Sequence, residues 1–333
     1  MADINTNTSS TIETLSQIWQ RVLQLPTVAP DDNFFDLGGD SVLAVQMFAE
    51  IAQVCGRQLP PVMIYHVPTI VALAAVVEHP TQLAVSPLVL LKDGARERPV
   101  FILPGLGGGP AEFFHLVKHM NVPPAIYGLQ PKGMDGFEEP AERIEDMAEF
   151  YLRAIQRLQP QGPYVLIGYS LGGLVALEMA QRLAALGEKM AQLIMVDSYP
   201  HIQYLSAGQR LRLTARRTRN RISEAARSLM GQAVRNPGRG NLDPEQAAAF
   251  APAFEKVRHC AFLALQHYQP RSYRGTIKFV RAEIVSEFPK NPAAVWAGLA
   301  DGFEAKTVPG DHLGMLTTHH QNLGSVLTRY LEV

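Results

Sequence analysis

The sequence predicts a small all-α bundle followed by an α/β domain that has a mostly parallel sheet and an inserted helical lid. At roughly 150 residues per domain, 333 residues allow about two domains. Helical periodicity fills residues 10–80, whereas beyond residue 98 apolar runs of strand length alternate with amphipathic helices. The first 80 residues carry a net charge of −6 and the remainder carries +5, which favours two domains of different character.

Three helical patterns define the bundle. The four residues from Ser10 have capping-box spacing, which predicts a first helix over about 11–25. Apolar residues recur every four positions from Leu43 in a second helix, and Thr69 is placed to cap a third. We therefore assign residues 10–80 to a helical domain.

A linker is predicted over residues 81–97, because Pro80, Pro87 and Gly94 interrupt the helical pattern there. The α/β domain is assigned to residues 98–333. Its strands are predicted by short apolar runs that are separated by helical patterns, at 99–103, 125–129, 163–168, 192–197, 275–282 and 303–308.

The segment at about 200–270 has helical pattern and no predicted strand. Such a stretch is too long for an ordinary connection between neighbouring strands. We interpret it as a helical lid inserted into the α/β domain.

Composition excludes several function classes. No run of 18 apolar residues occurs and the first ten residues are polar, so we expect a soluble, cytoplasmic protein without membrane contact. The two cysteines, Cys55 and Cys260, have no metal-ligand spacing, and no metal site is predicted.

The motif Gly168-Tyr169-Ser170-Leu171-Gly172 lies between a strand pattern and a helix pattern. This is the strand, elbow and helix context that a G-x-S-x-G nucleophile requires. The glycines permit a tight turn, which exposes the serine hydroxyl at the carboxyl edge of the sheet. The sequence therefore predicts Ser170 as a nucleophile in an α/β-hydrolase arrangement.

A serine nucleophile needs a histidine base and a carboxylate that orients the histidine. Asp197 ends the strand that follows Ser170, and His312 follows the last predicted strand, which matches the expected chain order of serine, acid and histidine. Asp311 is an alternative acid, although a side chain adjacent to its own histidine seldom reaches the ring nitrogen.

The glycine-rich segment from Pro104 to Gly109 follows the first strand of the α/β domain. It lacks the G-K-[ST] sequence of a phosphate-binding loop. We predict that the backbone N–H groups of Leu106 and Leu171 form an oxyanion hole, with Gly105 as the alternative to Leu106.

The run Asp36-Leu37-Gly38-Gly39-Asp40-Ser41 leads into the second helix of the bundle. A serine at a helix N-terminus lies where free N–H groups favour a phosphodiester. Taken alone, the same residues also fit an ordinary helix cap.

This run closely resembles the attachment motif of peptidyl carrier domains in nonribosomal peptide synthetases. It has Gly-Gly-Asp-Ser where such domains often have Gly-Gly-His-Ser. The resemblance implies covalent 4′-phosphopantetheine on Ser41. It also implies two kinds of partner, a phosphopantetheinyl transferase and the upstream synthetase domains that load the carrier.

Residues 98 to 333 resemble the type I thioesterase that ends such synthetases. Besides the serine motif, the segment Tyr127 to Gly136 is similar to a stretch typical of these thioesterases. The resemblance implies a serine thioesterase of secondary metabolite biosynthesis. It would take a peptidyl or acyl thioester from Ser41 onto Ser170 and release it by hydrolysis or cyclisation.

Two other functions remain open from the residues. The chain could be a lipase-like esterase with an incidental helical appendage, or a non-catalytic carrier that presents cargo to partners in trans.

A basic segment bears on possible partners. Residues 201–240 contain nine arginines, with Glu224 as the only acid. They fit a solvated helix face or a surface that guides the acidic carrier, rather than a nucleic-acid site, because aromatic residues are scarce there.

Overall fold

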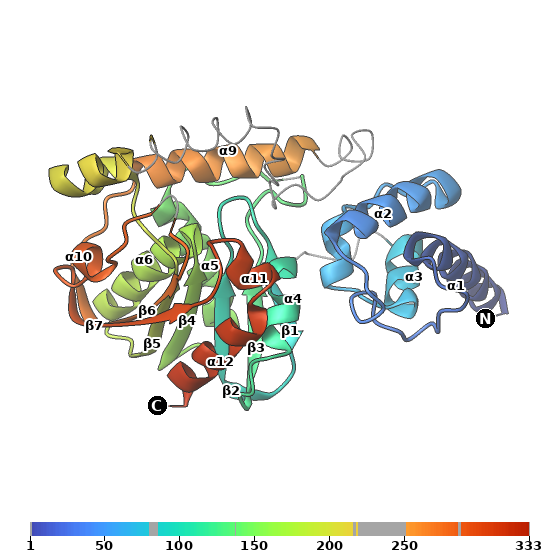
Figure 1. Cartoon of the computed structure of the whole chain (residues 1–333). Coiled ribbons are helices and arrows are strands. Elements are labelled where there is room, and N and C mark those ends of the chain that lie inside the picture. Colours follow the sequence, from blue (N-terminus) through green and yellow to red (C-terminus); the bar gives the residue numbers. More distant parts are fainter. Residues whose placement is uncertain are drawn as a thin grey trace.

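The computed structural model describes residues 2–79, 86–136, 138–215, 218, 251–285 and 288–332. A helical bundle at the N-terminus lies beside a larger body in which helices cover a twisted sheet (Figure 1). Within the described residues, no helix combines the length and the apolar character needed to cross a bilayer.

The N-terminal bundle consists of three α-helices and one 3₁₀-helix, namely α1 (Ala2–Leu23), α2 (Ser41–Cys55), η1 (Pro61–Tyr65) and α3 (Ile70–Glu78). Its core includes Trp19, whose ring packs edge-on against that of Phe34 with centroids 5.1 Å apart. Thr69 caps α3 as predicted, because its hydroxyl accepts the N–H of Ala72 at 3.3 Å.

The predicted start of the first helix was wrong. α1 begins at Ala2, so the residues from Ser10 onward lie inside the helix instead of capping it. The hydroxyl of Thr14 donates to the carbonyl of Ser10 at 2.9 Å, which satisfies this side chain within the helix. Because the preceding residues include no glycine or proline, nothing in them stops the helix.

The larger body contains one seven-stranded sheet with the order β1-β3-β2-β4-β5-β6-β7. Only β1 runs antiparallel to its neighbour; the other described pairings are parallel, as predicted. The strands are β1 (Leu88–Lys92), β2 (Ala95–Leu103), β3 (Pro124–Leu129), β4 (Tyr164–Tyr169), β5 (Met190–Val196), β6 (Tyr273–Ala282) and β7 (Ala300–Val308).

Strand β1 lies inside the segment that the sequence predicts to be linker. It is a short edge strand, of which Val89 is buried and Leu90 is 41% exposed. Five residues with one buried position resemble an irregular segment in sequence, and pairing with β3 decides their conformation. Residues 81–85 of the predicted linker lie outside the described residues, as does residue 80 before it.

Alternate residues of the strands pack on opposite faces of the sheet, which gives two hydrophobic cores. On one face, Phe101 and Leu103 of β2 pack with α5 (Ile144–Leu158), α6 (Leu171–Ala185) and α9 (Ala251–His267). On the other face, Val100 and Ile102 pack with helices that include α12. Further helices among the described residues are η3 (Pro110–Phe113), α4 (Phe114–Val117), η4 (Ile202–Tyr204), α10 (Ala293–Trp296), α11 (Gly314–Thr317) and α12 (His320–Leu331).

The predicted lid is described only at its two ends. Residues 207–215 are helical, and α9 lies across the upper edge of the body in Figure 1. Residues 216–217 and 219–250 lie outside the described residues, and with them seven of the nine arginines of this segment.

Candidate active site

Ser170 occupies the turn between β4 and α6, with φ 54° and ψ −119°. A positive φ is uncommon for a residue with a side chain, and it is the strained geometry expected at a nucleophile elbow. The flanking glycines allow this turn. A Cβ at Gly168 would collide with the backbone of Gly172 and Gly173, and one at Gly172 would collide with the carbonyl oxygen of Leu103.

The three side chains that the sequence predicts to act together, Ser170, His312 and Asp197, are connected by hydrogen bonds. The Nδ1 of His312 is 2.8 Å from Oδ2 of Asp197, and its Nε2 is 3.0 Å from Oγ of Ser170. Because a carboxylate can only accept, the ring proton lies on Nδ1. Nε2 is thereby left to accept a proton from the serine hydroxyl.

Asp197 is held at the carboxyl end of β5 and is only 2% exposed. Its Oδ1 accepts the N–H of Ala282 at 3.2 Å, so both carboxylate oxygens have partners. Asp311 has a different role, because its Oδ1 accepts the N–H of Gly314 at 2.7 Å in the turn before α11. The structure thus places Asp197, and not the alternative Asp311, against the histidine.

Two aromatic residues that the sequence reasoning missed enclose the ring of His312. Tyr169 stacks on it with ring centroids 4.9 Å apart and an interplanar angle of 20°. Phe288 lies 4.9 Å away at 55°. The Tyr169 hydroxyl also donates to the backbone carbonyl of His312 at 2.8 Å. Burial raises the pKa of Tyr169, which therefore stays a neutral donor.

The glycine-rich loop from Pro104 packs against the same tyrosine. A Cβ at Gly105 would come within 3.1 Å of the Tyr169 ring and 3.3 Å of Cβ of Ser170. This loop therefore lies beside the nucleophile, as an oxyanion loop must. Leu171 is the first residue of α6, so its N–H has no acceptor inside the helix. In the described part of the chain, no backbone carbonyl accepts the N–H of Leu106.

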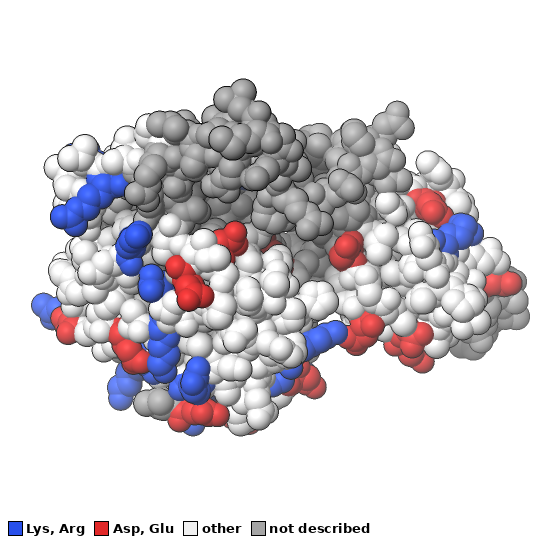
Figure 2. Space-filling model, viewed as in Figure 1, with Lys and Arg blue, Asp and Glu red and all other residues white. Residues whose placement is uncertain are grey.

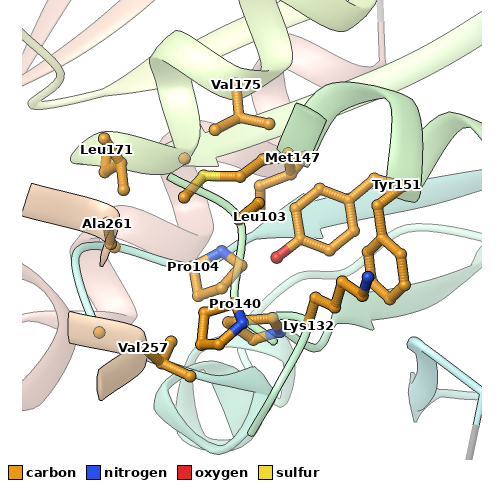
Figure 3. Close-up of a pocket in the computed structure, with 16 residues that line it drawn as sticks. Leu103, Pro104, Lys132, Pro140, Met147, Tyr151, Leu171, Val175, Val257 and Ala261 are labelled. Carbon is orange, nitrogen blue, oxygen red and sulfur yellow. The ribbon is translucent and has the colours of Figure 1, made fainter. Parts of the chain in front are cut away.

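An apolar pocket opens beside this loop, bounded by β2, α5, α6 and α9 (Figure 3). Leu171 and Val257 contribute to its wall, and the Tyr151 hydroxyl points into it. The pocket encloses about 30 Å³, enough for a water molecule or two.

The second predicted site lies in the N-terminal bundle, where α2 begins at Ser41. The preceding loop turns tightly, with Gly38 at φ 93°. A Cβ at Gly39 would collide with the ring and the carbonyl of Phe34, so this position accepts only glycine without rearrangement. Oδ1 of Asp40 accepts the N–H of Leu43 at 2.8 Å and so caps α2.

Comparison with known proteins assigns a family to each part of the chain. A family model of the thioesterase domain matches residues 98–330. A model of the phosphopantetheine attachment site matches residues 13–77. These ranges place Ser170, Asp197 and His312 in the first match and Ser41 in the second.

The relatives and solved structures similar to this chain include nonribosomal peptide synthetases and thioesterase domains. A dimodular nonribosomal peptide synthase of Bacillus subtilis (strain 168) is 32% identical over 292 residues, which cover 83% of this chain and 12% of that protein. The crystal structure of holo-AB3403, a four-domain nonribosomal peptide synthetase, covers 97% of this chain and 26% of its own, with 22% identity and a TM-score of 0.59. The NocB thioesterase domain from the nocardicin cluster covers 75% of this chain and 100% of its own, with 23% identity and a TM-score of 0.54. The chain thus spans about an eighth of the curated relative. It belongs to the thioesterase domain family and carries a phosphopantetheine attachment domain ahead of the thioesterase domain.

Proposed function

We propose that this chain releases an acyl or peptidyl chain in nonribosomal peptide biosynthesis, by transfer from the carrier domain to Ser170 and then to water or to a nucleophile within the cargo. The observation that carries the proposal is the hydrogen-bonded line from Asp197 through His312 to Ser170. It occurs in the same chain as an attachment domain that supplies a thioester. An esterase that acts without a carrier does not need the attachment domain. A non-catalytic carrier does not need the hydrogen-bonded residues Asp197, His312 and Ser170.

The first half-reaction follows from the geometry. Oγ of Ser170 attacks the thioester carbonyl while its proton passes to Nε2 of His312, which lies 3.0 Å away. The C–S bond then breaks, and His312 gives the proton to the departing sulfur. Asp197 stays ionised throughout and stabilises the charged imidazole, which it contacts at 2.8 Å.

The second half-reaction reverses the proton path. Water, or a hydroxyl or amine of the cargo, gives a proton to Nε2 of His312 as it attacks the ester on Ser170. The C–O bond to Ser170 breaks, and the serine recovers its proton from His312. In each half, the N–H groups of Leu106 and Leu171 would stabilise the negative charge on the carbonyl oxygen.

The residues around Ser41 suit the phosphopantetheine group that the attachment family carries. Ser41 begins a 15-residue helix, whose N-terminus favours an anionic phosphodiester. The group supplies a thiol that carries the cargo as a thioester. Asp40 caps the helix, and the compact turn at Gly39 holds Ser41 at its start.

The predicted domain limits and partners accompany this proposal. They are a carrier domain over 10–80, a linker over 81–97 and a thioesterase domain over 98–333 with its lid at about 200–270. The matched ranges 13–77 and 98–330 support the first and third of these limits. The expected partners are a phosphopantetheinyl transferase and the synthetase domains that load the carrier.

Serine replacements test the two assigned functions separately. Ser41→Ala should gain no pantetheine mass on treatment with a phosphopantetheinyl transferase, yet should still hydrolyse a small free thioester. Ser170→Ala should accept pantetheine and cargo, and then hold the cargo with a turnover reduced roughly 10⁴- to 10⁶-fold. Pantetheine on the Ser41 variant would reject the attachment site, and rapid discharge by the Ser170 variant would reject the nucleophile.

A further inference from the structure

Three aromatic residues join the carrier and thioesterase domains: Phe114 of the thioesterase domain contacts Phe35 and Tyr65 of the carrier. Phe35 of the carrier stacks on Phe114, the first residue of α4, with ring centroids 4.2 Å apart and an interplanar angle of 21°. Tyr65 of the carrier lies beside both rings, with its centroid 5.5 Å from that of Phe35 and 6.3 Å from that of Phe114. Phe114 belongs to the thioesterase domain but packs against the hydrophobic core of the carrier.

An ion pair lies beside this stack. Nζ of Lys118 is 3.1 Å from Oδ1 of Asp36, and the two side chains are 50% and 67% exposed. The pair joins a basic residue of the thioesterase domain to the acidic carrier. On the face shown in Figure 2 the carrier at the right displays more acidic than basic side chains.

In the sequence, both contacts lie close to segments that carry out the proposed reaction. Phe35 and Asp36 belong to the loop that leads into Ser41, and Phe114 follows the glycine-rich loop after a single 3₁₀-helix, η3. Within η3, the carboxyl group of Glu112 lies against Gly108 of that loop. The contact therefore joins the segment that bears the cargo to the segment that borders Ser170.

We propose that Phe114 and Lys118 form the docking face on which the thioesterase domain receives the Phe35–Asp36 loop of the carrier during discharge. This proposal rests on the proposed function and names the surface that function uses. Tyr65 supports it, because burial raises the pKa of this residue and the carboxylates of Glu112 and Asp40, one from each domain, add to the rise. Tyr65 thus lies near both the residue before Ser41 and the residue that borders the glycine loop.

The docking face is small, which suits a carrier that must arrive and leave. The ring contacts of Phe114 and one exposed ion pair form a weak contact. Because the two domains are tethered, a weak contact is populated through the high effective concentration of the carrier. Arg210 and Arg212, the two of the nine arginines at 201–240 that lie among the described residues, take no part in the aromatic contact or the ion pair of this face.

The test measures one discharge event in the full-length chain. Each variant is loaded on Ser41 from an acyl-coenzyme A by a phosphopantetheinyl transferase, its loading is measured by intact mass, and loss of the acyl group is followed over time. The same variants are assayed with an N-acetylcysteamine thioester, which reaches Ser170 without the carrier. Phe114→Ala should discharge about three- to tenfold more slowly, and Lys118→Glu about two- to fivefold more slowly. Hydrolysis of the free thioester should not change.

Charge reversal on both sides provides a rescue. Asp36→Lys should be slow alone, and Asp36→Lys combined with Lys118→Glu should recover most of the lost rate. Two controls match the chemistry away from the interface. Lys189→Glu reverses an exposed charge beside β5, and Leu186→Ala removes an apolar side chain that is 69% exposed. Both should discharge at the wild-type rate.

Unchanged discharge in Phe114→Ala and Lys118→Glu, or equal slowing with both substrates, would overturn the docking face. Faster discharge would also overturn it, because the contact would then hold the carrier in a resting position. Failure of the proposed function gives a different result. In that case the loaded wild-type chain itself keeps its acyl group, whatever the docking variants do.

Discussion

Replacing Tyr169 with phenylalanine should slow turnover of a small thioester about two- to tenfold without changing KM. The change removes only the hydroxyl that donates to the carbonyl of His312 at 2.8 Å and keeps the ring that stacks on the imidazole. That carbonyl is partly buried, so losing its partner costs about 1 kcal/mol. If this free energy is lost from the positioning of His312 in the transition state, a barrier that is about 1 kcal/mol higher lowers the rate about fivefold.

A second tyrosine on the same strand gives a matched control. Tyr164 begins β4, and its hydroxyl donates to the carbonyl of Gln159 at 3.0 Å, at the end of the strand far from Ser170. Tyr164→Phe should lower the free energy of unfolding by a similar 1 kcal/mol and leave kcat unchanged. Tyr169→Leu should lose more activity than Tyr169→Phe, because it also removes the ring stack.

The assay combines steady-state kinetics on an N-acetylcysteamine thioester with urea unfolding of each variant. A positioning role for Tyr169 predicts a loss in kcat that Tyr164→Phe lacks at equal stability. Equal kcat in the two phenylalanine variants, or a change confined to KM, would contradict a positioning role for Tyr169. Tyr169 would then be only a packing residue.

Three further outcomes follow from the site. Asp197→Asn should reduce kcat by several orders of magnitude, because the amide can donate an N–H to Nδ1 of His312 and so favour the tautomer with its proton on Nε2. Asp311→Asn should retain most activity, and the kcat values of the two variants identify which acid orients the histidine. An ester bond in place of the Leu106 amide should reduce kcat roughly 10²- to 10³-fold if that N–H binds the oxyanion, and the same change at Gly105 should have less effect. Gly172→Ala should lower the free energy of unfolding by about 1–3 kcal/mol, measured in urea, since its Cβ meets backbone carbonyl oxygens; unchanged stability would contradict the close approach.

The sequence alone was enough to predict the order and type of most elements. Apolar runs identified six of the seven strands, and their order along the chain placed Ser170, Asp197 and His312 at strand ends. Parallel strands bring their carboxyl ends to one edge of a sheet, so residues distant in sequence could be predicted to meet there. The positive φ of Ser170 follows equally from the local glycine pattern.

Other contacts depend on the tertiary structure, because they produce no periodic pattern in the sequence. The Tyr169 hydroxyl meets the His312 carbonyl across 143 residues, and Asp36 meets Lys118 across 82. Strand β1 forms because it pairs with β3. Helix α1 extends back to Ala2 because its first residues include no helix breaker. Periodicity and turn chemistry act over a few neighbouring residues. The aromatic packing around His312 and the contact between the two domains arise only when distant surfaces come together, since their stability comes from burial of one surface against the other.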